Sequence, residues 1–231
     1  RARALQDVSL TIPKGSVVAL VGLSGCGKST TASLLMRFCD AAAGHIYMDG
    51  KDYHSMKPEE LRKHIAMVPQ QVNLFSGTIR ENLLLADPDA DDQTLMEAVK
   101  EAGLLKFVQS LEKGLNSDVG NAGASLSGGQ RQKIGIARAL LSKAEYMIFD
   151  EATSSVDPES EKEIWETIGH LAHTRTLIII SHRMSSVRGA DCIYVLKDGR
   201  VAQQGDHETL MAQDGLYHEL VIRQQAMEVA E

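Results

Sequence analysis

The chain reads Val17-Val18-Ala19-Leu20-Val21, and Gly22-Leu23-Ser24-Gly25-Cys26-Gly27-Lys28-Ser29 follows at once. Five consecutive apolar residues predict a strand buried on both faces of a sheet. The loop after it fits the pattern G-x-x-x-x-G-K-[ST], and a helix is expected from Lys28 to about Cys39. This order of strand, glycine-rich loop and helix predicts an α/β fold built around a phosphate-binding loop.

The chemistry of this loop explains the pattern. Glycines let successive backbone N–H groups point at phosphate oxygens, and the start of the helix adds unpaired donors and a partial positive charge. Lys28 would reach the β- and γ-phosphates, and the Ser29 hydroxyl would ligate Mg²⁺. A chance glycine-rich turn is the alternative, and the flanking strand and helix argue against it. The candidate phosphate-binding residues are Gly22, Leu23, Ser24, Gly25, Cys26, Gly27, Lys28, Ser29 and Thr30.

Two acids follow a second apolar run, at residues 146–149. In an open parallel sheet, ligands bind at the carboxyl edge of the strands, where Asp150 and Glu151 are expected to lie. Asp150 is placed to hold Mg²⁺ and Glu151 to polarise an attacking water. The alternative is a strand that ends in solvated acids, and the nearby phosphate loop makes it the weaker interpretation.

A third candidate site is Ser127-Gly128-Gly129-Gln130. Ser127 and Gln130 have the spacing of a capping box, so a plain helix start is one interpretation. Two glycines in a first turn weaken a helix, however, and they let an anion come close to its N-terminus. Because one phosphate loop suffices for one nucleotide, this second phosphate site is expected to serve a nucleotide held by another copy.

The remaining pattern alternates helices with apolar strands. This alternation predicts a mostly parallel sheet covered on both faces and interrupted by a helical insertion. We expect further strands at residues 5–12, 45–48, 65–68, 177–180, 193–196 and 201–203. Further helices are expected from Pro58, over residues 93–102, from Ser127, from Pro158 with Asp157 as N-cap, and from about Glu208.

Composition narrows the class of protein. A hydrophobic fraction of 43% is enough for a packed core and argues against disorder. The formal net charge of −7 argues against a nucleic-acid binder with a broad basic face. Cys26, Cys39 and Cys192 are too scattered for a disulfide framework, so a reducing cytosol is expected. The chain starts at Arg1, which suggests a piece of a longer protein.

The pentapeptide Leu126-Ser127-Gly128-Gly129-Gln130, together with the phosphate loop, resembles the nucleotide-binding domain of an ATP-binding cassette (ABC) transporter. The resemblance covers nearly the whole chain. It implies a P-loop NTPase (RecA-like) core with a small antiparallel β-subdomain, at residues 1–74 and 142–231. It also implies an inserted α-helical subdomain, at residues 75–141, that carries the signature pentapeptide.

The resemblance assigns roles to further residues. Gln70 resembles the Q-loop glutamine, which contacts Mg²⁺ and the attacking water, and His182 resembles the switch histidine that contacts the γ-phosphate. The stretch Ser154-Ser155-Val156-Asp157 resembles the D-loop, which crosses between two copies. The family's adenine-stacking aromatic would fall before Arg1. Asn121 and Ala122 replace residues that exporters commonly carry where the cassette faces the coupling helices of its membrane domain.

The implied function is an ATPase that binds ATP and Mg²⁺, closes head to tail on a second copy or a homologous cassette, and powers export. Each site would combine the phosphate loop, Gln70, Asp150, Glu151 and His182 of one copy with Ser127–Gln130 of the other. Residues 74–82 and 205–217 resemble exporters, whose membrane domain is usually fused ahead of the cassette. The resemblance places the cassette, itself soluble, at the cytoplasmic face of the membrane, with no nucleic-acid partner.

Other members of the same family stay open as alternatives. DNA-repair and chromosome-structure ATPases carry long coiled-coil insertions, for which the stretch between Gln70 and Leu126 is too short. Translation-associated members carry tandem cassettes, and this chain has one. Glu151 and His182 argue against a non-catalytic regulatory cassette. An importer cassette is the nearest alternative to an exporter.

Overall fold

Parallel pairing dominates the central sheet of the computed structural model, which describes residues 4–172 and 174–228. The strand order is β4-β5-β6-β1-β7-β8. The first five strands run parallel, and β8 pairs antiparallel with β7. The mostly parallel sheet expected from the apolar runs is thereby confirmed. The strands are β1 Val17–Val21, β4 Ile65–Val68, β5 Tyr146–Asp150, β6 Thr176–Ile180, β7 Cys192–Lys197 and β8 Arg200–Gly205.

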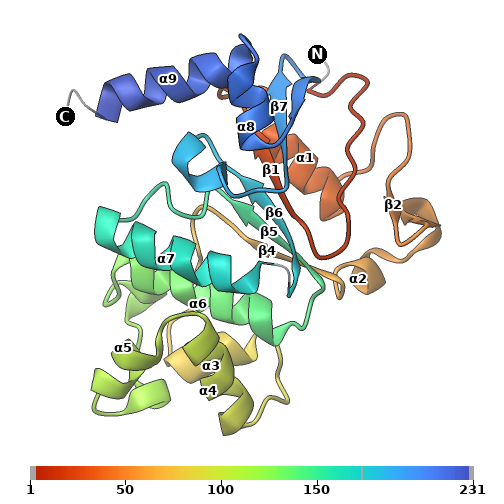
Figure 1. Ribbon diagram of the computed structural model, residues 1–231. Helices are drawn as coiled ribbons and strands as arrows, with labels where there is room; N and C mark the ends of the chain where they lie inside the picture. Colours follow the sequence, from red (N-terminus) through yellow and green to blue (C-terminus); the bar gives the residue numbers. More distant parts are fainter. Residues whose placement is uncertain (1–3, 173, 229–231) are drawn as a thin grey trace.

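Helices cover both faces of this sheet, as Figure 1 shows. The α-helices are α1 Lys28–Leu35, α2 Pro58–Leu61, α3 Ile79–Leu84, α4 Asp92–Glu101, α5 Leu105–Ser110, α6 Gly128–Leu141, α7 Pro158–Leu171, α8 His207–Ala212 and α9 Leu216–Glu228. Short 3₁₀ helices are η1 Tyr53–Ser55, η2 Gly114–Asn116, η3 Asn121–Gly123 and η4 Met184–Val187. The expected helix starts at Pro58 and Pro158, and the cap at Asp157, are confirmed.

Alternate residues of β1 enter two different cores, because successive side chains of a strand point to opposite faces. Val17, Ala19 and Val21 pack with the apolar side chains of α3 to α7. Val18 and Leu20 pack on the other face, with residues of α1 and the segment around Tyr53. This burial on both faces explains why β1 is apolar without interruption.

A separate two-stranded sheet pairs β2 (Tyr47–Met48) antiparallel with β3 (Lys51–Asp52). Asp49 and Gly50 connect these strands with φ values of 50° and 78°. Positive φ at both central residues is the mark of a type I′ turn, which the Asp-Gly pair predicts. The hairpin belongs to the part of the chain expected to form a small antiparallel β-subdomain.

The strand predicted at residues 5–12 does not form, so that prediction is wrong. Leu10 and Ile12 do pack against the second core, as their alternation indicates. The backbone of Thr11, however, bonds to a side chain: its N–H donates to the Tyr194 hydroxyl (2.9 Å), which in turn donates to its carbonyl (3.0 Å). The Tyr194 hydroxyl thus makes the hydrogen bonds that a neighbouring strand was expected to make with Thr11.

Helix α1 ends four residues earlier than the predicted limit at Cys39. Arg37 has φ of 50°, and the N–H of Phe38 donates to the Ser33 carbonyl (2.8 Å) while the N–H of Arg37 donates to the Leu34 carbonyl (3.0 Å). This pair of bonds is a Schellman motif, which closes a helix C-terminus. The guanidinium of Arg37 donates to the Tyr53 carbonyl (2.6 Å), so the strained residue is fixed in place.

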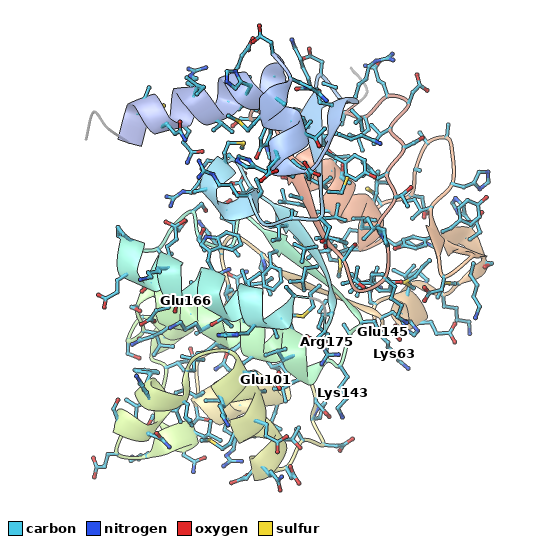
Figure 2. All side chains as sticks on the ribbon, viewed as in Figure 1. Lys63, Glu101, Lys143, Glu145, Glu166 and Arg175 are labelled. Carbon is cyan, nitrogen blue, oxygen red and sulfur yellow. The ribbon has the colours of Figure 1, made fainter. Side chains whose placement is uncertain are left out.

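Charged residues stand before the strands at the amino edge of the sheet. Figure 2 shows Lys63, Glu145 and Arg175, which precede β4, β5 and β6, on the same side of the molecule. Glu145 there forms an ion pair with Lys14 in which both side chains are exposed. Exposed pairs of this kind contribute little, so we regard this edge as a solvated surface.

Asn82 on α3 organises the start of the helical insertion, although it is almost fully buried. Its Oδ1 accepts from the Phe75 N–H (2.9 Å) and from Arg138 Nη2 (2.6 Å), and its Nδ2 donates to the carbonyls of Phe75 and Thr78 (both 2.9 Å). All four bonding positions of this amide are filled.

Replacing Asn82 by Ala should lower the free energy of unfolding by about 3 kcal/mol, because it leaves several buried polar groups without partners. Urea denaturation measures this loss. Gln93→Ala on the exposed face of α4 is the control, and it should stay within about 0.5 kcal/mol of the wild type. An Asn82→Ala chain as stable as this control would contradict the central role of Asn82.

Candidate functional site

Parallel register brings the predicted site residues to one edge of the sheet. Ile180 of β6 stands opposite both Leu20 of β1 and Asp150 of β5, and Phe149 stands opposite Val68 of β4. The carboxyl ends of these four strands therefore meet at the same edge. The loops that leave them carry the phosphate loop, Gln70, Asp150 with Glu151, and His182.

The phosphate loop already holds its lysine in position. Lys28 is buried, and its Nζ donates to the carbonyls of Gly22 (2.7 Å) and Leu23 (3.2 Å). Gly27 begins α1 without a side-chain cap, so the helix leaves backbone N–H groups for an anion. Ser29 is exposed on the first turn of the same helix. A cation, open N–H donors and a hydroxyl thus converge at the start of α1.

Gly22 is required for a steric reason. Its φ is 148°, and a Cβ at this position would lie 2.3 Å from the Leu196 carbonyl oxygen. Cys26 fills the inside of the same loop: it is buried, and its Sγ lies 3.9 Å from Lys28 Nζ. The thiol therefore packs as a small side chain within the loop.

Two carboxylates follow β5. Burial raises the pKa of Asp150 first of all, the charge of Glu151 raises it further, and the charge of Lys28 opposes both. Glu151 has φ of 50°, and its N–H donates to the Ile180 carbonyl (2.9 Å). Left-handed backbone is costly for a residue with a Cβ, and unlike Arg37 and Asp49, Glu151 adopts it in no helix cap or hairpin turn. The strained backbone turns Glu151 away from the strand direction.

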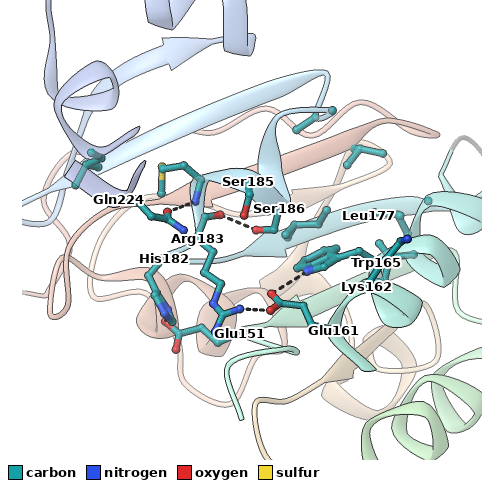
Figure 3. Close-up of a pocket in the computed structure, with 18 of the residues that line it drawn as sticks. Glu151, Glu161, Lys162, Trp165, Leu177, His182, Arg183, Ser185, Ser186 and Gln224 are labelled. Atoms are coloured by element: carbon teal, nitrogen blue, oxygen red, sulfur yellow. Dashed lines mark hydrogen bonds and ion pairs between the residues drawn. The ribbon is translucent and has the colours of Figure 1, made fainter. Parts of the chain in front are cut away.

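His182 lies beside Glu151. Its Nδ1 is 3.4 Å from Glu151 Oε1, and its side chain is half exposed while that of Glu151 is largely covered. Figure 3 shows the two side chains next to each other at the mouth of a pocket. At this distance the imidazole and the carboxylate form an ion pair when the imidazole is protonated.

A groove of about 1460 Å³ opens at this edge. Gly22, Leu23 and Ser24 line it together with Glu151 and His182, and its walls continue along α7 and α9 (Figure 3). The structure therefore joins part of the phosphate loop to the proposed water-activating pair.

Gln70 is exposed directly after β4, the strand next to β5. Its neighbour Pro69 accepts a hydrogen bond from the Nε2 of Gln132 (2.9 Å), which is buried on α6. Gln132 thus ties the Gln70 segment to the helix that begins at the signature. Sequence reasoning missed Gln132, because a glutamine inside a helix gives no local signal of a contact so distant in the chain.

The signature residues form the start of α6. Ser127 and Gln130 make the predicted capping box: the Ser127 Oγ accepts from the Gln130 N–H (3.1 Å), and the Gln130 Oε1 accepts from the Ser127 N–H (2.9 Å). Gly129 has a packing role besides: a Cβ there would lie 2.4 Å from the Ser160 Oγ on α7. None of residues 127–130 lines the groove that holds Glu151 and His182.

The oxygen atoms at this edge fit Mg²⁺. Ser29 offers a hydroxyl, Gln70 an amide oxygen and Asp150 a carboxylate, the ligand types that this cation prefers. Burial and the charge of Glu151 raise the pKa of Asp150, and only the charge of Lys28 lowers it. A cation bound there would therefore offset the cost of ionising Asp150. Within the described residues, no cluster of three His, Cys, Asp or Glu side chains is suited to a metal.

Comparison with known proteins places the chain in a family. Residues 5–154 match the family described as ABC transporter. The chain is 45% identical over 221 residues to the human "Mitochondrial potassium channel ATP-binding subunit", covering 95% of this chain and 30% of that protein. It is 43% identical over 217 residues to the "ATP-dependent lipid A-core flippase 1" of Colwellia psychrerythraea, covering 94% of this chain and 36% of that one.

A solved structure supports the same relationship. The chain resembles a bacterial Atm1-family ABC exporter with ATP bound, with a TM-score of 0.89 and 40% identity over 96% of this chain and 39% of that one. The chain thus spans well under half the length of these relatives. Within residues 4–172 and 174–228, no helix combines the length and apolar composition that a membrane span requires.

Replacing Asp150 by Asn should stabilise the metal-free chain at neutral pH. Since the pKa of Asp150 is raised in the folded state, its ionised form opposes folding above that pKa, and the cost disappears as the pH falls through it. The melting temperature in a chelator should therefore be higher for Asp150→Asn at pH 7.5, with a difference that shrinks toward acid pH.

Asp157→Asn provides a control of opposite sign. The N–H of Ser160 lowers the pKa of Asp157, so its charge stabilises the fold above the ordinary carboxyl range and this contribution is lost at acid pH. Asp157→Asn should lower the melting temperature at pH 7.5. An Asp150→Asn chain that melts below the wild type at pH 7.5 would contradict the assigned electrostatics.

Proposed function

Because this chain belongs to the ABC transporter family, we propose that it is the ATP-binding and ATP-hydrolysing cassette of an exporter. The observation that carries this proposal is the meeting of Gly22, Glu151 and His182 in one groove at the carboxyl edge of the parallel sheet. The exporter assignment rests on relatives that include a lipid A-core flippase and an Atm1-family exporter.

Each site residue has a proposed role that follows from its chemistry. The open N–H groups at the start of α1 and the ammonium of Lys28 bind the phosphates of ATP. Ser29, Gln70 and Asp150 hold Mg²⁺, which when bound neutralises charge on the phosphate oxygens. Leu23, Ser24, Gly25, Cys26, Gly27 and Thr30 complete the phosphate-binding set.

Glu151 and His182 act on the water and the γ-phosphate. Glu151 accepts a proton from the attacking water, and His182, 3.4 Å away, orients that carboxylate and contacts the γ-phosphate. The left-handed backbone of Glu151 holds its carboxylate at the groove, where it stays in place during turnover.

We also propose that the site is completed by a second copy. Residues 127–130 do not line the groove of their own chain, yet Ser127 and the N–H groups of the first α6 turn are suited to a phosphate. A head-to-tail pair would place these groups of one copy on the nucleotide of the other, with residues 154–157 between them.

The membrane domain of the same transporter is proposed to dock beside Gln70. A groove of about 330 Å³ lies there between the segment Pro69 to Asn73 and α6, with Val72 and Arg138 in its lining. Phe75 nearby is 65% exposed, as expected of an apolar side chain that a partner covers. This docking would place the cassette at the cytoplasmic face of the membrane.

Lys28→Ala and Glu151→Gln should separate binding from chemistry. Lys28→Ala should weaken ATP binding at least about tenfold, because it removes the buried ammonium from the loop. Glu151→Gln should bind ATP normally and lower the rate of hydrolysis about 100-fold or more. Calorimetry and phosphate release measure the two effects, with Lys106→Ala on α5 as the matched charge control. Normal turnover by Glu151→Gln would refute its role as the base.

The solution mass of the Glu151→Gln chain tests the shared site. Light scattering should give a monomer without nucleotide and a dimer with MgATP. Adding Ser127→Asp should keep the helix cap, since aspartate caps well, but its charge opposes a phosphate from the partner. The double variant should bind ATP and remain a monomer. A dimer formed equally well by the double variant would contradict the assignment of residues 127–130.

A further inference from the structure

The loops that carry Glu151 and His182 are joined by a carboxylate outside the catalytic set. Glu161 lies on the first turn of α7, and its side chain is largely buried. Its Oε1 accepts from the Thr153 hydroxyl (3.1 Å) and from the Trp165 Nε1 (3.4 Å). Its Oε2 forms an ion pair with the guanidinium of Arg183. One carboxylate therefore contacts both loops.

Two of the three partners of Glu161 stand close to the catalytic pair in the sequence. Thr153 is two residues after Glu151 and is buried, and Arg183 directly follows His182. Figure 3 shows Arg183 reaching past His182 and Glu151 toward Glu161. Any movement of Glu161 is thus transmitted to the residues on which the position of Glu151 and His182 depends.

His182 itself has few constraints of its own. Its side chain is half exposed, so its position depends on the backbone on either side. That backbone is held by Arg183, whose N–H donates to the Ser181 Oγ (2.9 Å), and by the Met184 N–H, which donates to the Gln224 Oε1 on α9 (2.7 Å). The Ser186 hydroxyl also donates to the Arg183 carbonyl (2.6 Å), and Glu161 adds a contact to Arg183 that reaches the Glu151 loop as well.

We propose that Glu161 is a positioning residue for hydrolysis, which sets the distance between Glu151 and His182 by tying Thr153 and Arg183 together. This inference rests on the proposed ATPase activity. A carboxylate suits the task, because it accepts from a hydroxyl on one oxygen and pairs with a guanidinium on the other. Both oxygens of Glu161 are taken by protein partners, so in this proposal it acts through Thr153 and Arg183.

Glu161→Gln is the informative variant. The amide oxygen still accepts from Thr153 and Trp165, while the ion pair with Arg183 is lost, so the fold is preserved. We expect kcat for ATP hydrolysis to fall about tenfold, since small displacements of reacting groups are costly. KM should stay within about twofold, because Lys28 and Ser29 are untouched. Rates are normalised to bound ATP, which removes any effect of a smaller folded fraction.

Glu101→Gln on α4 is the matched control. Glu101 is exposed and lies outside the groove (Figure 2), and the same change of charge there should leave kcat unchanged. Arg183→Gln should reproduce the effect of Glu161→Gln, and the double variant should be no slower than either single variant, because both break one interaction.

The His182→Ala background separates positioning from general stability. If Glu161 acts through His182, Glu161→Gln should cause no further loss of single-turnover rate in His182→Ala. The inference is overturned if Glu161→Gln keeps the wild-type kcat, or if it lowers the rate by the same factor with and without His182. A wild-type chain that binds ATP and releases no phosphate would instead overturn the proposed function, and the inference with it.

Discussion

Parallel backbone pairing of β1, β5 and β6 is the constraint on which the rest of the structure depends. Ile180 faces both Leu20 and Asp150 across the sheet, so the ends of three strands coincide. Each strand then delivers one chemical group to a common edge: the ammonium and N–H groups after β1, the carboxylates after β5, and the imidazole after β6. A shift of one residue in either pairing would displace these groups from one another, because residues advance about 3.3 Å along a strand.

The charged groups at this edge of the sheet suit a bound ligand better than they suit the folded chain alone. Lys28 is buried and bonded to two loop carbonyls, and Asp150 is half-buried beside a second carboxylate. Phosphate and a divalent cation would each offset one of these costs. The strained backbone of Glu151 adds a further local cost at the same place. These groups lower the stability of the folded chain, and binding of a nucleotide can restore that stability because it favours the folded state.

Local sequence patterns predicted the strands and helix caps that neighbouring residues determine. They failed where contacts between residues far apart in the sequence determine the structure. The structure confirms the strands β1 and β4 and the caps at Ser127 and Asp157, all of which follow from neighbouring residues. Residues 5–12 were wrongly expected to form a strand. Their alternating pattern indicates which side chains are buried, but it does not indicate that the backbone N–H and carbonyl of Thr11 bond to the Tyr194 hydroxyl. Glu161 was missed for the same reason: its partners Thr153 and Arg183 are adjacent only after folding.

The contact between Gly129 and Ser160 has a consequence for communication between two nucleotides. No room exists there for even a methyl group, so the N-termini of α6 and α7 form a rigid joint. The first of these helices starts at the residues proposed to contact the partner's nucleotide, and the second carries Glu161 next to Ser160 in its first turn. In the proposed dimer, a displacement imposed on α6 by the nucleotide of the other copy would therefore reach α7 and Glu161 through direct steric contact. Occupancy of one site would in this way be sensed at the other.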